Sequence, residues 1–151
     1  MMLKIILLSS LILLPTKGVE IEDVKPVPKD VIIFDMETIK IAEAIKKHET
    51  NGNCSLKGAS GEIGCMQYTK GTWNALTKKY YGEVKGYSTT TEEFITLKYI
   101  QDLGDLKPQQ VFQTWNQGTY KKPCIRGVNK FGVKYDSCAY IKKVMAIYNK
   151  L

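Results

Sequence analysis

The fold is decided by residues 35–67, which read DMETIKIAEAIKKHETNGNCSLKGASGEIGCMQ. Asp35 can cap a helix, because its side chain can accept hydrogen bonds from backbone amides two or three residues further on. Ile45 and Glu49 are separated by a helical spacing of four residues, so they share one face. Asn51-Gly52 is a helix stop signal. The sequence therefore predicts an amphipathic helix from Asp35 to Glu49, with a glutamate that continues its apolar face.

Glu49 has the position expected of a general acid. It lies in the last turn of the predicted helix, beside backbone carbonyls that have no partner within the helix. Partial burial and the negative end of the helix dipole both disfavour the ionised carboxylate, so we expect a raised pKa. A carboxyl group that stays protonated near neutral pH can protonate a leaving group. The plain alternative is a solvated glutamate at a helix end.

The rest of the chain also reads as mainly helical. Few segments alternate with a strand period, so we expect a mainly α domain in which any β structure is short. Cap and stop residues predict four further helices, which run from Lys70 or Thr72 to Tyr81, from Thr90 to Gly104, from Pro108 to Gly118, and from Asp136-Ser137 onward. The class is a single small domain of about five or more helices.

The predicted helix from Thr90 to Gly104 carries two acidic residues near its start. Thr90 and Glu93 have the spacing of a capping box. Glu92 and Glu93 favour a helix start by their charge, and we expect both to be solvated and to have no role in the site. The predicted apolar face consists of Phe94, Leu97, Ile100 and Gln101.

The N-terminal part predicts export. Residues 1–18 combine Lys4 with a short apolar run, which is typical of a secretory signal peptide cleaved after Gly18. A membrane span would need about 20 apolar residues, and an uncleaved anchor is the alternative. Residues 19–34 contain Pro26 and Pro28 and predict an extended arm. Residues 35–151 are expected to form the domain.

The charge is moderately basic. The 151-residue chain has a net charge of +7, and removal of residues 1–18 takes away Lys4 and Lys17 and no acid, leaving +5. A basic exported protein suits an anionic cell wall, although ordinary solubility explains the charge equally well. Nucleic-acid binding is not expected, because Arg126 is the single arginine and no basic cluster exceeds two residues.

The four cysteines predict two disulfides. In an oxidising compartment an even set of cysteines is typical of a disulfide framework, and three pairings exist. We favour Cys54 with Cys65 and Cys124 with Cys138, because each pair joins sequence neighbours across a loop. The first would contribute on the order of 3 kcal/mol to stability. Zinc is the rival interpretation, which the absence of Cys-x-x-Cys and the presence of a single His disfavour. No cofactor is expected.

Four segments together resemble the soluble-type lytic transglycosylases, whose catalytic domain is lysozyme-like. They are His48-Glu49-Thr50, Gly61-Glu62-Ile63-Gly64-Cys65-Met66-Gln67, Trp115-Asn116-Gln117-Gly118 and Tyr140. The family has a Glu-Ser pair at a helix end, a Gly-x-x-Gly-Leu-Met-Gln loop, a Tyr-Asn-Ala-Gly segment, and a tyrosine opening the last helix. Order and spacing agree over about 110 residues. The substitutions of Cys65 for Leu and of Gln117 for Ala depart most from the pattern.

The resemblance implies roles for particular side chains. Glu49 is the single acid and base, Tyr140 orients it, and a substrate-binding set lines a catalytic cleft; that set is Thr50, Glu62, Met66, Gln67, Trp115, Asn116 and Tyr140. Core packing is the alternative for Met66 and Trp115. Glu62 is the acid that could activate water for hydrolysis, and its alternative role is to pair with a lysine or to bond loop amides. We expect His48 to be structural.

The function implied is cleavage of the β-1,4 bond between N-acetylmuramic acid and N-acetylglucosamine in peptidoglycan, with a 1,6-anhydro product. The expected location is secreted, periplasmic or cell-wall associated. The alternatives are a hydrolytic muramidase and a wall-binding accessory protein without activity. By analogy, a small domain of this kind could serve a secretion or conjugation machine.

Overall fold

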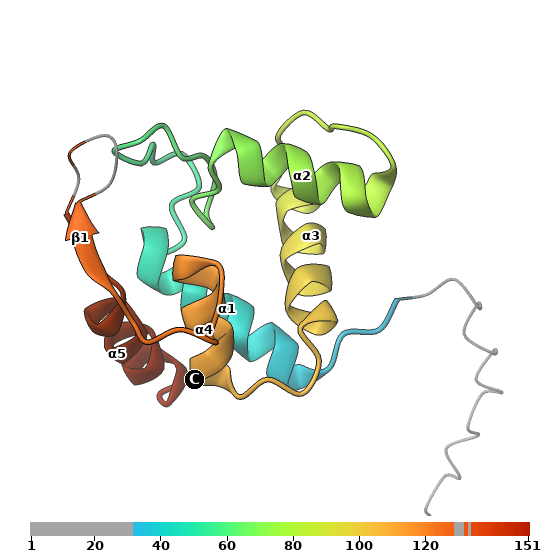
Figure 1. The fold of residues 1–151 in the computed structure, drawn as a ribbon. Coiled ribbons are helices and arrows are strands. Elements are labelled where there is room, and N and C mark those ends of the chain that lie inside the picture. The colour runs from blue at the N-terminus through green and yellow to red at the C-terminus, as the bar shows by residue number, and fades with distance from the viewer. Residues whose placement is uncertain (1–31, 129–131, 133) are drawn as a thin grey trace, which may run out of the picture. The chain divides into compact units, whose positions relative to one another are not determined.

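Helices dominate the part of the chain that the structure, a computed structural model, describes: residues 32–128, 132 and 134–151 (Figure 1). Five helices and one short hairpin occur among these residues, and the expected mainly α class is confirmed. Their bounds are α1 Met36–Thr50, α2 Lys70–Tyr81, α3 Thr89–Asp102, α4 Pro108–Gln117, β1 Arg126–Val128, β2 Lys134–Asp136 and α5 Ser137–Tyr148.

The helix that carries Glu49 begins and ends as predicted. The Asp35 carboxylate accepts a hydrogen bond from the Thr38 amide at 2.7 Å, which satisfies one of the free donors at the start of α1. Asn51 adopts a left-handed conformation with a φ of 51° and ends the helix. Glu49 therefore lies in the last turn of α1.

The start and face of α3 differ from the prediction. The capping residue is Ser88, whose hydroxyl accepts from the Thr91 amide at 3.1 Å, and Thr90 lies inside the helix. The buried face consists of Glu92, Ile95, Thr96 and Ile100. The expectation that Glu92 is solvated is wrong, because its side chain has partners in a loop 26 and 27 residues earlier.

Helices α1, α3, α4 and α5 form the centre of the core. In Figure 1, α1 passes through the middle of the helical unit, and it packs against α5 and α3, while α4 packs against α5. Fully buried side chains come from each of these helices; the largest apolar ones are Phe112, Ile45, Ile95, Val111 and Val144. Helix α1 is therefore in contact with two other helices, α3 and α5.

The hairpin places a short β element before α5. Strands β1 and β2 are antiparallel, with Arg126 opposite Asp136. These two residues also form an ion pair at 2.7 Å, and Asp136 caps α5 by accepting from the Ala139 amide. The hairpin thus sets the start of the last helix.

Both predicted disulfides are confirmed. Cys54 is bonded to Cys65 and Cys124 to Cys138. The described residues contain no free cysteine. Two disulfides in so small a protein indicate an oxidising, extracytoplasmic environment. The zinc interpretation of the cysteines is not supported, because all four sulfur atoms are joined in pairs.

The predicted signal peptide, residues 1–18, and most of the predicted arm lie outside the described residues. Residues 33–151 form one compact unit. It includes the end of the expected arm, because the Ile33 carbonyl accepts from the Gln101 side chain and the Phe34 ring packs against Phe94. Where the chain is described, none of its helices combines the length and apolar character needed to span a bilayer.

Candidate active site

A groove of about 620 Å³ lies beside the last turn of α1. Its walls come from α1, from the loop between α1 and α2, and from α2, α3 and α4. The lining side chains that bear on chemistry are Glu49, Glu62, Gln67, Tyr68, Tyr99, Trp115 and Asn116. No Lys, Arg or His is among the described residues that line it.

Glu49 is a half-buried carboxyl group on the groove wall. The Tyr140 hydroxyl donates a hydrogen bond to Glu49 Oε1 at 2.8 Å. Burial raises the pKa of Glu49 above the usual glutamate value, the Tyr140 hydrogen bond opposes this rise, and the negative charge of Glu62 adds to it. The direction of the predicted pKa shift is therefore confirmed, and burial is its largest cause.

Tyr140 lies on α5 and packs against the core. Burial and the neighbouring Glu49 raise its pKa well above the usual tyrosine value, so the hydroxyl stays protonated and can donate. Its ring meets the His48 ring edge to face, with 4.7 Å between centroids. Burial and the charge of Lys143 lower the pKa of His48. The His48 ring thus packs against the tyrosine that holds Glu49, which agrees with the structural role expected of it.

Glu62 lies on the same groove as Glu49. Its Oε2 accepts a hydrogen bond from the Ser60 amide at 2.8 Å, which agrees with the expected alternative that it bonds loop amides. Gly58 makes room for it, because a Cβ at Gly58 would lie 2.1 Å from Glu62 Oε2. Glu62 is therefore a second carboxylate of the groove, and its charge acts on Glu49.

Gln67 and Met66 contribute to the groove in different ways. Gln67 has a φ of 53°, in the left-handed region that glycine favours, and its side-chain amide donates to the Gly64 carbonyl at 2.8 Å. Backbone strain of this kind persists where the surroundings fix it. Met66 is buried and belongs to the core, while one edge of it reaches the groove. Both interpretations of Met66 thus describe part of its position.

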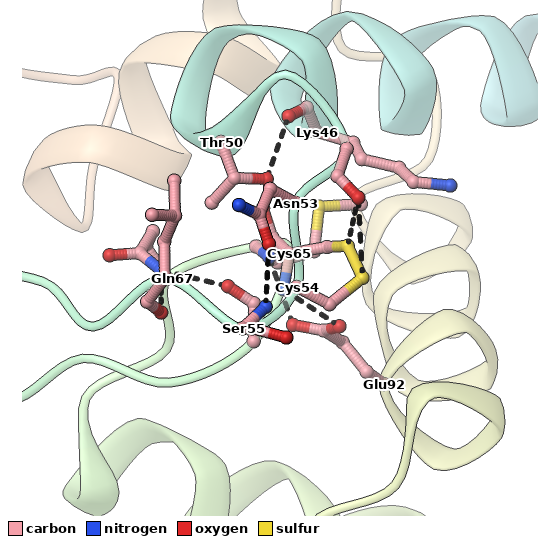
Figure 2. Close-up of a disulfide and its surroundings, with 12 residues drawn as sticks. Lys46, Thr50, Asn53, Cys54, Ser55, Cys65, Gln67 and Glu92 are labelled. Carbon is pink, nitrogen blue, oxygen red and sulfur yellow. Dashed lines mark hydrogen bonds between the residues drawn. A yellow bond between two sulfur atoms is a disulfide. The ribbon is translucent and has the colours of Figure 1, made fainter.

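Thr50 does not reach the groove. It is buried, and its hydroxyl donates to the Cys65 carbonyl at 3.0 Å (Figure 2). The family resemblance placed it in the substrate-binding set, as the counterpart of the serine in the Glu-Ser pair. Adjacent residues of a helix face about 100° apart. The Thr50 side chain therefore points toward the loop that contains Cys65 and not into the groove.

Aromatic rings form one wall of the groove. The half-buried Trp115 ring lies 5.3 Å from the Tyr68 ring and 5.9 Å from the Tyr99 ring, and the exposed Asn116 follows it. Tyr68 and Tyr99 were not singled out from the sequence. The sequence signal for Tyr68 was its place directly after Gln67, whereas Tyr99 had no signal, since a ring contact with Trp115, 16 residues later in the chain, accompanies its place on the groove.

One group of potential metal ligands occurs among the described residues. Atoms of Cys54, Cys65 and Glu92 lie within 4.8 Å of one another. The two sulfur atoms are bonded to each other, and the Glu92 carboxylate accepts hydrogen bonds from two backbone amides. A disulfide and a hydrogen-bonded carboxylate therefore account for this group.

The groove brings a potential proton donor together with polar and aromatic groups. It offers one protonatable carboxyl, a second carboxylate, amide groups and aromatic rings. Aromatic rings cover the apolar faces of sugars, and amides meet their polar groups. Comparisons with protein-family models, curated proteins and solved structures found no match to this chain.

Proposed function

We propose that this protein is a secreted lytic transglycosylase that cleaves peptidoglycan strands in the groove beside Glu49. The observation that carries the proposal is the Glu49 carboxyl group itself. It is half-buried on a groove wall, its pKa is raised, and the Tyr140 hydroxyl donates to it. These are the properties of a general acid that operates near neutral pH.

The reaction needs one carboxyl group in two protonation states. Protonated Glu49 donates its proton to the oxygen of the β-1,4 bond, so the N-acetylglucosamine side leaves as an alcohol. The ionised carboxylate then takes the proton of the 6-hydroxyl of N-acetylmuramic acid, and that oxygen attacks the anomeric carbon. The product is a 1,6-anhydro sugar, the acid is regenerated, and no water is consumed. The hydrogen bond from Tyr140 stabilises the ionised state between the two steps.

Glu62 supports hydrolysis as a second candidate. Most glycosidases use two carboxyl groups, one as an acid and one as a base or nucleophile. Glu62 lines the same groove as Glu49, and its negative charge raises the pKa of Glu49. Hydrolysis would require Glu62 to take the proton of an attacking water, in competition with the Ser60 amide that it already binds.

Three further lines support an enzyme of the cell wall. Residues 48–50, 61–67, 115–118 and 140 resemble motifs of the lytic transglycosylases, and each of the four segments places a side chain on the groove or against Glu49. The disulfides fit action outside the cytoplasm. The lack of basic side chains in the groove suits a neutral glycan backbone. Service to a secretion or conjugation machine rests on analogy.

Mass spectrometry of the fragments released from purified peptidoglycan tests the proposal. The oxidised protein is compared with Glu49→Gln and with Glu43→Gln, a matched control on the exposed side of α1. The proposal expects anhydro fragments, about 18 mass units lighter than hydrolytic ones, from the wild type and Glu43→Gln but not from Glu49→Gln. Hydrated fragments would establish a muramidase and assign the base to Glu62. If none of the three proteins released fragments, the protein would be a wall-binding protein without cleavage activity.

A further inference from the structure

Glu92 is a buried carboxylate outside the proposed active site. Only 2% of its surface is exposed, and it projects from the first turns of α3 toward the loop that contains Cys65 (Figure 2). It does not line the groove. A buried carboxylate is costly unless it is hydrogen-bonded, so its partners explain why it is there.

Three donors from other segments converge on Glu92. The Cys65 amide donates to Oε2 at 3.0 Å, and the Met66 amide donates to Oε1 at 2.9 Å. The Tyr87 hydroxyl donates to Oε2 at 2.9 Å. Hydrogen bonds to an ionised acceptor are about twice as strong as those between neutral groups. The carboxylate therefore holds two consecutive backbone amides of the loop.

The loop is shaped to receive this carboxylate. A Cβ at Gly64 would lie 2.1 Å from Glu92 Oε1, so only glycine leaves room for it. Gly64 also has a φ of 80°, which glycine adopts without strain. The peptide between Cys65 and Met66 is held on its carbonyl side as well, because the Thr50 hydroxyl donates to the Cys65 carbonyl at 3.0 Å. Loop residues 64–66 are thus fixed from α3 and from the end of α1.

What this contact positions is the wall of the groove. Met66 and Gln67 follow directly, both line the groove, and Gln67 is held in a left-handed conformation. We propose that Glu92 is a positioning residue of the active site, whose carboxylate fixes the Cys65 and Met66 amides and so sets the place of Gln67 on the groove wall. Its effect on glycan binding rests on the proposed function.

Binding of a neutral substrate fragment is the first test. Calorimetry with tetra-N-acetylchitotetraose is performed in the Glu49→Gln background, in which cleavage does not interfere. Adding Glu92→Gln places an amide NH₂ against a backbone donor, so the Kd is expected to rise about tenfold or more, the effect of losing a hydrogen bond to a charged group. Adding Glu93→Gln, the exposed neighbour, is expected to leave the Kd unchanged. An unchanged Kd in the Glu92→Gln protein would overturn the proposal.

A stability control separates positioning from general weakening. Thr77 is fully buried on α2, and its hydroxyl donates to the Trp73 carbonyl of the same helix. Thr77→Val loses an internal hydrogen bond without touching the Glu92 contact. With both variants folded at the assay temperature, only Glu92→Gln should weaken binding. Equal weakening by Thr77→Val would mean that Glu92 acts through stability alone.

Amide hydrogen exchange provides a test that does not depend on activity. In the wild type, the Cys65 and Met66 amides should exchange as slowly as buried helical amides such as Ile45. In Glu92→Gln they should exchange about tenfold faster or more, while amides of α5 are unaffected. Fast exchange of these amides in the wild type would refute the proposal, even if Glu92→Gln failed to fold. If the tetrasaccharide did not bind Glu49→Gln, amide exchange would still decide the role of Glu92.

Discussion

Replacing Tyr140 by phenylalanine removes one hydroxyl from the proposed site and leaves the ring. That hydroxyl donates to Glu49 Oε1 at 2.8 Å, and a donor to a carboxylate stabilises its ionised form. The Tyr140→Phe variant should therefore raise the pKa of Glu49 further. A hydrogen bond to a charged group contributes about 1.5 to 3 kcal/mol. Because Glu49 is only half-buried and water can take the place of the hydroxyl, the lower figure applies, which is roughly a tenfold change in its proton dissociation constant.

The assay is a carbon-detected NMR titration of the Glu49 carboxyl group, combined with the pH profile of peptidoglycan cleavage. The alkaline limb of kcat/KM should move to higher pH, since that limb reports loss of the acid's proton in the free enzyme. The maximal rate should fall about tenfold, because the second step needs an ionised and oriented carboxylate.

Tyr148→Phe is the matched control. Its hydroxyl also donates from α5 to a glutamate of α1, in this case Glu37 on the exposed surface. This variant should change neither the pKa of Glu49 nor the alkaline limb. An unchanged or lowered pKa of Glu49 in Tyr140→Phe would refute the reasoning, and so would an equal shift in Tyr148→Phe.

Three other predictions concern the same groove and its loop. Glu49→Gln should melt at a higher temperature than the wild type at pH 7, because burial raises the pKa of the Glu49 carboxyl and the ionised group opposes folding. The difference in melting temperature should vanish below about pH 4, where the carboxyl is protonated in both the folded and the unfolded chain. A lower melting temperature for Glu49→Gln at pH 7 would contradict this. Glu62→Gln should shift the alkaline limb to lower pH, opposite to Tyr140→Phe, because a negative neighbour of Glu49 is lost; retention of most turnover fits the transglycosylase, and a collapse of turnover fits the hydrolase. Replacing both Cys54 and Cys65 by serine should lower the unfolding free energy in urea by about 3 kcal/mol, the chain-entropy value for a loop of this size, and a loss under about 1 kcal/mol would show that hydrogen bonds alone hold the loop.

Local signals were sufficient to predict the helices and most of their ends, although not the start of α3. Asp35 caps α1, Asn51 and Gly118 end helices in left-handed conformations, and Pro108 opens α4. Each of these effects depends on a residue and its neighbours within one turn, which the sequence contains in full. The disulfide pairing was predictable for the same reason, because both bridges join cysteines that are close in sequence.

The error over Glu92 has a different physical origin. A glutamate in the first turn of a helix is favourable on local grounds, and nothing near Glu92 in sequence indicates burial. Its partners are two backbone amides 26 and 27 residues earlier in the chain. These amides face Glu92 only because the loop turns at Gly64. The place of Thr50 was misread similarly, since its acceptor is a backbone carbonyl 15 residues later in the chain. Contacts of this range depend on packing, which short-range patterns do not contain.

The pairing of Glu49 with Tyr140 joins residues 91 positions apart, on the first and last of the described helices. Such a pair cannot form until α5 has been made and has passed through an export channel, because α5 emerges after every other described element. A chain that ended before α5 would present a glutamate without its orienting hydroxyl. If the proposed activity is correct, the order of synthesis itself delays that activity until the whole helical unit has folded, so an unfinished chain would not yet have a competent acid.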